Sequence, residues 1–313
     1  MNHAIARRQF LQTAAAAAIT GAGLGAAAPG AAQTEPPGVN SGEAKLPRLL
    51  PGCCAYSYGP DLRRGPMTME SFIRKAVELR VDAVDMTVYY FKSTDPAYLA
   101  GLRDLAYKLA VPFSGAACGV SMVQADPAKR AQSLIDIKKW VDVTDQLGAS
   151  HLRVFAGKLP PGATLQQAVD WTVDTMKAAS DYSGNKGIRL GLEDHSGISQ
   201  TAEVCLEIMH RVNSPYVGIN LDITHFVPTP GQDAYAQIAS CIPYATVTHI
   251  RDRFDDGSPI DMDRVWRMFA DAGHKGYMSA EYERKYGGGE DATTGVPKLI
   301  AEIRALCQKY SSA

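Results

Sequence analysis

Four side chains that can bind a divalent metal follow one another at regular intervals in the second half of the sequence. In chain order they are Glu193, Asp222, His249 and Glu281. Each is separated from the next by 27 to 32 residues, which is about the length of one strand-plus-helix unit of a (β/α)8 barrel. Successive strands of such a barrel end at one rim, so we expect these side chains to converge there. The sequence therefore predicts a mononuclear metal site.

The predicted ligand set consists of three carboxylates and one imidazole, so oxygen dominates it. Such sets favour Mn2+, Mg2+ or Co2+ over the zinc of thiolate sites, although Zn2+ is also compatible. We expect one divalent ion as cofactor, with Mn2+ as the first choice. Four protein ligands leave open coordination positions, which two adjacent oxygens of a sugar can fill. Polarisation of the sugar carbonyl then stabilises an enediolate once the neighbouring proton is removed.

Glu193 and Glu281 are also the candidates for acid–base catalysis. They end the fifth and eighth predicted strands, so they approach a substrate from separated directions. One carboxylate can remove a proton, and the other can return it on the opposite face or at the neighbouring carbon. A lone carboxylate at a strand end is more often a helix cap or a partner of a surface cation. Here the residue types, their regular spacing and their position on the same face of each predicted strand together favour the catalytic interpretation.

Eight apolar runs alternate with longer segments of helical periodicity, which is typical of a parallel sheet covered by helices. The predicted strands are residues 52–57, 83–88, 111–116, 151–155, 188–193, 217–222, 246–251 and 277–282. The predicted helices include residues 69–79, 96–109, 127–147, 165–182, 202–212, 263–272 and 296–310. Strand parity sets Glu193 and Asp222 opposite the apolar residues of their strands, so they should point into the barrel. We expect a single α/β domain, a (β/α)8 TIM barrel, over residues 48–313.

The N-terminal 32 residues have the features of a twin-arginine export signal. Arg7 and Arg8 precede an apolar pair, an Ala-rich and Gly-rich stretch, and small residues that suit a signal peptidase. A disordered tail or a membrane anchor is the alternative, but the stretch is short and barely apolar, so we expect no stable membrane insertion. Residues 33–47 are rich in Gly, Pro and Glu, as in a linker. We therefore expect a periplasmic or otherwise exported protein.

Charge and cysteine content narrow the classes of function. The formal net charge of -1 offers no basic surface for nucleic acid. The six cysteines show no CxxC pair or other metal-type spacing. Cys53 and Cys54 are neighbours on a predicted strand and are interpreted as small core residues, although export could oxidise some cysteines.

Four segments resemble the sugar phosphate isomerase/epimerase family, whose members are xylose isomerase-like TIM barrels. They are Gly191-Leu-Glu-Asp-His-Ser-Gly197, Ser214-Pro-Tyr-Val-Gly-Ile-Asn-Leu-Asp222, His249-Ile-Arg-Asp252 and Gly276-Tyr-Met-Ser-Ala-Glu-Tyr-Glu283. The resemblance runs from about Leu50 to the C-terminus. It implies that Glu193, Asp222, His249 and Glu281 bind one divalent ion. The resemblance to the ketose 3-epimerase members of the family implies that Glu193 and Glu281 are the acid/base pair. Barrels of this family often form homo-oligomers, so the resemblance also implies a possible homo-oligomer.

Three further residues are candidate substrate contacts. Asp222-Ile-Thr-His225 is similar to the Asp-x-x-His segment of the ketose 3-epimerases, whose histidine contacts the substrate. Arg251 stands where many relatives have lysine, and it can offset the carboxylate charge or bind a substrate oxygen. Its alternative is an internal ion pair with Asp252 or another nearby acid. His195 follows the first ligand by two residues and ranks below His225.

Two positions stay without a clear assignment. His151 and Arg153 belong to the fourth predicted strand and can point inward or pair within the barrel, so they are given no role. Asp85 stands where many relatives have glutamate, which leaves a substrate contact from the second strand uncertain.

These observations predict a divalent-metal-dependent sugar isomerase or epimerase. An exported enzyme fits a non-phosphorylated sugar or keto-sugar, and no phosphate-binding loop is evident. The alternatives are a metal-dependent lyase or deglycosidase acting on keto-glycosides, a metal-independent glycosidase with two glutamates, and a non-catalytic exported sugar-binding barrel. An apurinic endonuclease fits poorly, because it needs several ions, more than the seven histidines present and a basic face.

Overall fold

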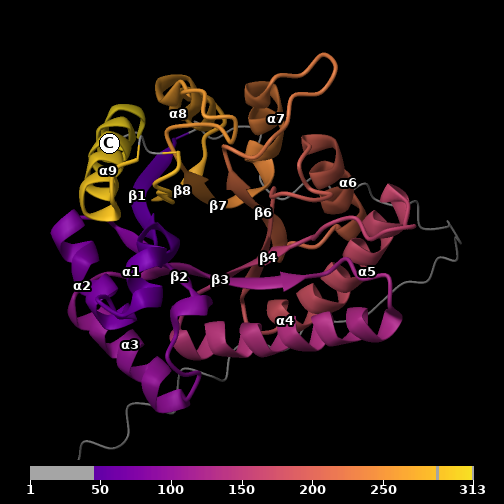
Figure 1. Ribbon diagram of the computed structural model, residues 1–313, viewed down its shortest axis with the longest axis horizontal. Helices are drawn as coiled ribbons and strands as arrows, with labels where there is room; N and C mark the ends of the chain where they lie inside the picture. The colour runs from indigo at the N-terminus through magenta and orange to yellow at the C-terminus, as the bar shows by residue number, and fades with distance from the viewer. Residues whose placement is uncertain (1–45, 287–288, 312–313) are drawn as a thin grey trace, which may run out of the picture. The chain divides into compact units, whose positions relative to one another are not determined.

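The computed structural model describes residues 46–286 and 289–311. Eight parallel strands close into a barrel in chain order, with β1 paired to β8 (Figure 1). The strands are β1 (Arg48–Cys54), β2 (Ala83–Thr87), β3 (Phe113–Ser121), β4 (His151–Phe155), β5 (Arg189–Glu193), β6 (Val217–Asp222), β7 (Ala245–Ile250) and β8 (Lys275–Ala280). The predicted export signal and residues 33–45 of the predicted linker lie outside the described residues.

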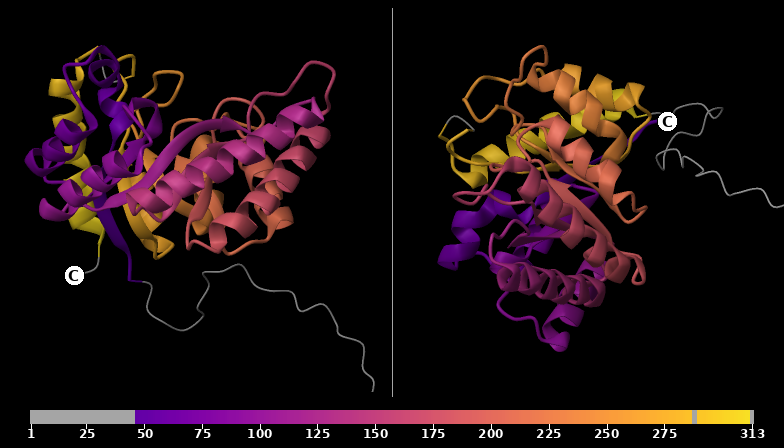
Figure 2. Two further views of the ribbon diagram at one scale, coloured as in Figure 1. Left: turned by 90° about the horizontal axis from the view of Figure 1, so that it is seen from below. Right: turned by 90° about the vertical axis from the view of Figure 1, so that its right-hand side faces the viewer.

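Helices cover the outside of the barrel, and Figure 2 shows the two longest of them, α4 and α5, side by side. They are α1 (Gly59–Arg64), α2 (Met69–Leu79), α3 (Pro96–Lys108), α4 (Pro127–Leu147), α5 (Leu165–Gly184), α6 (Ala202–Val212), α7 (Ala234–Cys241), α8 (Met262–Asp271) and α9 (Ala292–Tyr310). The predicted TIM barrel is confirmed. No helix in the described part of the chain is long and apolar enough to cross a membrane.

Local sequence signals explain where the helices begin and end. The Thr68 and Thr164 side chains accept hydrogen bonds from the third backbone N–H of α2 and α5, which stabilises each helix start. Gly148 ends α4 in the left-handed conformation, with φ of 83°, which a residue without a Cβ adopts at little cost. The chain can then turn directly into the next strand.

One histidine inside the barrel faces glycines on both neighbouring strands. His151 of β4 lies between Gly115 of β3 and Gly191 of β5, and its Nε2 is 3.0 Å from the Thr246 hydroxyl of β7. A Cβ added at Gly191 would lie only 2.3 Å from the imidazole Nε2. Small residues on the flanking strands therefore make room for one large polar ring inside the barrel.

Some element boundaries differ from the predicted ones. β1 begins four residues before the predicted strand and ends at Cys54, because residues 55–58 form a 3-10 turn instead. α1 and α7 were not predicted; they span only 6 and 8 residues, too few to give a clear helical period. α9 begins at Ala292 rather than at residue 296 and carries Pro297 inside, with Asp291 capping its first turn.

Candidate metal centre

The four predicted ligands converge inside the C-terminal rim of the barrel. Glu193 and Asp222 are the last residues of β5 and β6, His249 lies one residue before the end of β7, and Glu281 follows β8 directly. One ligand atom from each residue lies within 4.8 Å of every other. All four side chains are buried. The barrel thus brings together residues that lie up to 88 positions apart in the chain.

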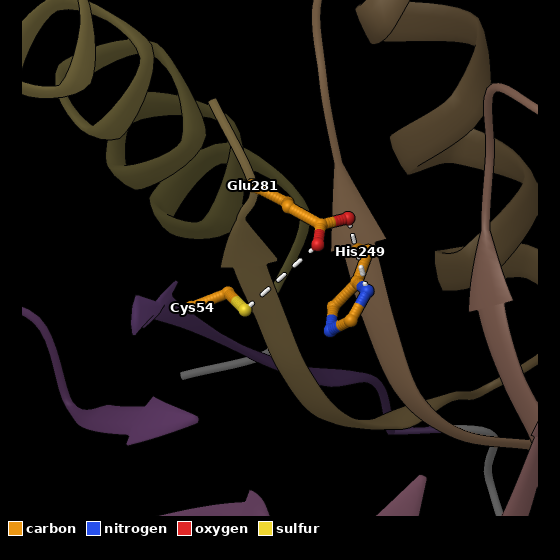
Figure 3. A group of neighbouring side chains, drawn as sticks. All are labelled: Cys54, His249 and Glu281. Carbon is orange, nitrogen blue, oxygen red and sulfur yellow. Dashed lines mark hydrogen bonds and ion pairs between the residues drawn. The ribbon is translucent and has the colours of Figure 1, made fainter. Parts of the chain in front are cut away.

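His249 lies at the middle of this group. Its Nδ1 is 2.8 Å from Glu193 Oε1 and 3.2 Å from Glu281 Oε2. Figure 3 shows the imidazole of His249 and the carboxylate of Glu281 facing each other, with the Cys54 sulfur pointing toward them. The Cys54 sulfur is 4.0 Å from Glu281 Oε1. Cys54, His249 and Glu281 form a second group whose possible ligand atoms lie within 4.8 Å of one another.

Cys54 is a buried strand residue, as expected, but it borders the site, which the sequence analysis did not anticipate. Burial raises the pKa of its thiol to about 11, so without a bound ion the sulfur is protonated at neutral pH and is a weak hydrogen-bond donor. All six cysteines lie within the described residues, are buried and form no disulfide.

Two buried arginines hold the carboxylates in their charged form. Arg153 lies 3.0 Å from Glu193 Oε2. Arg251 lies 3.0 Å from Asp222 Oδ2 and 3.1 Å from Glu281 Oε2. Burial disfavours these charges, but Arg153 and His249 outweigh it and lower the pKa of Glu193 to about 2. His249 and Arg251 likewise hold the pKa of Glu281 well below its usual range.

Arg251 combines two of the interpretations drawn from the sequence. It offsets the charge of two predicted ligands, and it does so through internal ion pairs. Its further charged contacts are Asp255, at 3.6 Å, and Glu283, at 3.3 Å. The partner considered from the sequence, Asp252, is not among its ion-paired carboxylates in the described residues.

Arg153 contacts the predicted ligand group, although the sequence analysis left it without a role. It lies on β4 next to β5, and its guanidinium donates to the carboxylate of Glu193, the last residue of β5. It also stacks over the ring of Phe155, 4.0 Å from the ring centre. An arginine inside a short apolar strand was the available signal, because a buried cation requires a buried partner.

His225 and His195 form a wall beside the ligands. His225 Nε2 is 3.2 Å from Asp222 Oδ2, and its Nδ1 is 2.7 Å from Asp255 Oδ2. Burial opposes the charge on this imidazole, but Asp222 and Asp255 outweigh it and raise the pKa of His225 well above its usual range. The His195 ring lies 4.6 Å from that of His225 and 4.8 Å from that of Phe155.

Hydrogen bonds from neighbouring residues fix the orientation of the ligands. The Asn220 amide donates to Glu193 Oε1 at 3.2 Å, and the Thr224 backbone N–H donates to Asp222 Oδ1 at 2.9 Å. The Asp194 carboxylate accepts from the backbone N–H of Asp222 at 2.7 Å. Ligands held in this way need little reorganisation to bind an ion.

The donor set fits a divalent cation. Five buried carboxylates gather here against two arginines and two histidines; they are Asp85, Glu193, Asp194, Asp222 and Glu281. Asp222 Oδ2 is ion-paired, yet it accepts no hydrogen bond of good geometry among the described residues. A buried carboxylate oxygen with a free lone pair is what a bound dication would satisfy.

Two cavities open at the rim on either side of the His195–His225 wall. The Phe155 cavity has a volume of about 710 Å³ and is lined by Tyr89, Phe155 and His195 among others. The Phe254 cavity has a volume of about 520 Å³ and includes Thr224, His225, Tyr235, Phe254 and Asp255. None of the four predicted ligands lines either cavity: the Phe155 cavity is separated from Glu193 by Arg153, which packs on Phe155, and the Phe254 cavity contains His225, which contacts Asp222.

Comparison with known proteins agrees with this architecture. A D-psicose 3-epimerase from Clostridium cellulolyticum H10, solved with D-tagatose, has a TM-score of 0.67 and 12% identity, covering 84% of this chain and 100% of that one. A D-allulose 3-epimerase from Methylomonas sp., solved with D-allulose, has a TM-score of 0.65 and 18% identity, covering 85% and 98%. The zinc-bound IOLI protein has a TM-score of 0.63 and 18% identity, covering 85% and 100%.

At these identities the solved structures establish the fold alone. A comparison with curated proteins gave no match. The model of the xylose isomerase-like TIM barrel family matches residues 73–306, which is most of the chain. The protein therefore belongs to the xylose isomerase-like TIM barrel family.

Proposed function

We propose that the protein is a divalent-metal-dependent isomerase or epimerase of a non-phosphorylated sugar or keto-sugar. One observation carries the proposal: three carboxylates and one imidazole meet within 4.8 Å inside the barrel rim. The fold that the chain shares with two sugar 3-epimerases supports it. The residues that would hold the ion are Glu193, Asp222, His249 and Glu281, and Mn2+ is the ion we expect.

The ion would supply Lewis acidity toward a sugar carbonyl and a neighbouring hydroxyl. The protein's own contribution is proton transfer by Glu193 and Glu281. Because their paired arginines keep both carboxylates charged at neutral pH, either one can accept a proton from the carbon beside the carbonyl. The carboxylic acid formed can return that proton at the neighbouring carbon while the hydroxyl proton passes to the former carbonyl oxygen, which is isomerisation. Epimerisation instead requires a proton on the opposite face, which the second glutamate must first take up from solvent and then donate.

The charged residues around the ligands would bind and orient the sugar. His225 borders the Phe254 cavity, and Asp222 and Asp255 raise its pKa, which favours a ring that donates a hydrogen bond to a substrate oxygen. Arg251 lies against Asp222 and Glu281 and can stabilise negative charge that develops on the sugar. His195 lines the Phe155 cavity and offers its ring as a packing surface.

Solvent exchange tests this proposal directly. The Mn2+-loaded protein is incubated with a panel of free ketoses and keto-glycosides in deuterated water, and each sugar is examined by NMR. We expect deuterium at one carbon beside the carbonyl of at least one sugar. The proposal fails if no sugar in the panel exchanges with the loaded protein.

Two matched glutamate variants assign the exchange to the site. Glu281→Gln should lose about 100-fold or more of the exchange rate, because the amide cannot accept the proton. Glu302→Gln changes the same functional group on the exposed side of α9 and should leave the rate unchanged. Equal rates in both variants would show that the exchange arises elsewhere.

The two cavities favour a second candidate, a metal-dependent lyase or deglycosidase acting on oxidised glycosides. Space on both sides of the His195–His225 wall can hold a sugar ring and an aglycone. Removal of a proton beside a keto group forms a carbon–carbon double bond, and the bond to the glycosidic oxygen breaks as the aglycone leaves. Mass spectrometry separates the candidates, since an isomerase conserves the molecular formula and a lyase releases a second molecule.

We also propose that the protein acts outside the cytoplasm as a homo-oligomer. Export is supported by the paired Arg7 and Arg8 ahead of a small-residue stretch. Residues 1–45 fused to a folded reporter should direct it to the periplasm, and replacement of both arginines by lysine should stop this. Light scattering of the purified protein tests the oligomeric state.

A further inference from the structure

Asp85 of β2 contacts the imidazole of His249 across the barrel interior. Its Oδ2 is 3.0 Å from His249 Nε2, and both side chains are fully buried. β2 and β7 are not neighbours in the barrel, since β8 and β1 lie between them. The contact is therefore made through the interior and does not follow from sheet pairing.

The two nitrogens of His249 face different partners. Nδ1 faces Glu193 and Glu281, where the ion would bind, whereas Nε2 faces Asp85. An imidazole that binds an ion gives it the lone pair of one nitrogen and keeps hydrogen on the other nitrogen. With an ion bound beside Glu193 and Glu281, Asp85 Oδ2 would accept a hydrogen bond from Nε2, which favours the hydrogen on that nitrogen. The lone pair is then left on Nδ1, on the side of the other ligands.

Asp85 has few other hydrogen bonds to account for its burial. Its Oδ1 has no hydrogen-bond partner among the described residues. In the sheet it pairs in register with Cys54 of β1 and Gly115 of β3, neither of which offers it a cation. Burial of a carboxylate with so few partners lowers the stability of the folded protein. The contact with His249 is therefore the clearest reason for an aspartate at this position.

We propose that Asp85 is a positioning residue that sets the hydrogen of His249 on Nε2 and so presents Nδ1 to the ion. The proposal rests on the metal centre of the proposed function and adds to it a residue from outside the ligand set. Loss of such an outer carboxylate typically weakens metal binding by about 10- to 100-fold. Asp85→Asn should show this loss, because an amide can donate to Nε2 and favour the wrong tautomer.

Calorimetric titration with Mn2+ measures the effect without any substrate. We expect the Kd of Asp85→Asn to rise by about 10- to 100-fold over that of the wild type. Ser279→Ala is the matched control, because Ser279 is buried beside His249 in the β7–β8 register but carries no charge. The Kd of Ser279→Ala for Mn2+ should change by less than about threefold, because no hydrogen bond joins the Ser279 side chain to a predicted ligand among the described residues. Equal losses in the two variants would overturn the proposal.

The nitrogen that binds the metal can also be identified in the wild-type protein. With 15N-labelled histidine and diamagnetic Zn2+, two-bond proton–nitrogen correlations should show His249 bound through Nδ1 and protonated at Nε2. Binding through Nε2 would overturn the proposal even if Asp85→Asn does not fold.

The outcomes separate this proposal from the one on which it rests. If the wild-type protein binds neither Mn2+ nor Zn2+, the metal centre and the proposed function fail together. If the wild type binds metal and Asp85→Asn binds it equally well, only the role of Asp85 is refuted.

Discussion

Replacement of His274 by leucine should make the barrel less sensitive to acid. His274 lies just before β8 and is nearly buried, with its ring packed edge-on against Phe269 at 5.0 Å. Its Nε2 has no hydrogen-bond partner among the described residues. Burial alone lowers the pKa of His274 to about 4, because the charged imidazole would lose its hydration.

The size of the effect follows from the two pKa values. An unfolded chain binds the His274 proton near pH 6.5, whereas the folded chain binds it near pH 4. A lowered folded pKa means that the contribution to stability is complete above about pH 6.5 and is lost as the pH falls toward 4. The full gap corresponds to about 3 kcal/mol, of which about 2 kcal/mol is lost between pH 7.5 and pH 5.

Urea unfolding of the wild type and His274→Leu at pH 7.5 and pH 5 gives the assay. Both proteins are measured with chelator present, so that metal occupancy does not vary with pH. The other histidines contribute equally to both proteins and cancel in the comparison. We expect the wild type to lose about 2 kcal/mol more than the variant between the two pH values. Parallel losses in the two proteins would refute the assignment of a buried neutral imidazole at this position.

Three further changes probe the interior and the metal centre. Arg153→Met leaves Glu193 buried without its cation and should cost about 3 to 5 kcal/mol in urea unfolding. Part of this should return in the Arg153→Met/Glu193→Gln double variant, and additive losses would contradict the ion pair. Gly191→Ala places a Cβ against the imidazole of His151 and should cost about 1 to 3 kcal/mol, measured by thermal unfolding, and an unchanged melting temperature would contradict this. Mn2+ at about 100 times its Kd should stabilise the chelated protein by about 2.7 kcal/mol, and an unchanged melting temperature would argue against binding.

Residues with a regular spacing made the barrel and its ligand group predictable from the sequence. The interval between Glu193, Asp222, His249 and Glu281 matches the repeat of the fold, and each falls at a strand end. Strand parity then indicated which way the side chains point, because it alternates strictly along a strand. Both signals are local or periodic, so one sequence was enough to read them.

Contacts across the barrel interior could not be predicted in the same way. Asp85 meets His249 across the barrel and Arg153 meets Glu193 from the neighbouring strand because of the three-dimensional arrangement of the strands and the reach of these side chains. The spacing of residues along the chain does not show how the strands are arranged or how far a side chain reaches across the barrel. The short helix α7 was not predicted for a different reason, because its eight residues give little more than two helical turns and so no clear periodic pattern.

The pairing of β1 with β8 has a consequence for how the molecule matures. The ring of strands is completed only when the first strand and the last one meet, and in that closed ring Asp85 and His249, 164 positions apart, lie in contact. A growing chain that lacks its last strand would also lack Glu281. Capture of an ion would thus be reserved for finished molecules, and the metal content of a preparation would report the fraction of chains that had reached the end of folding.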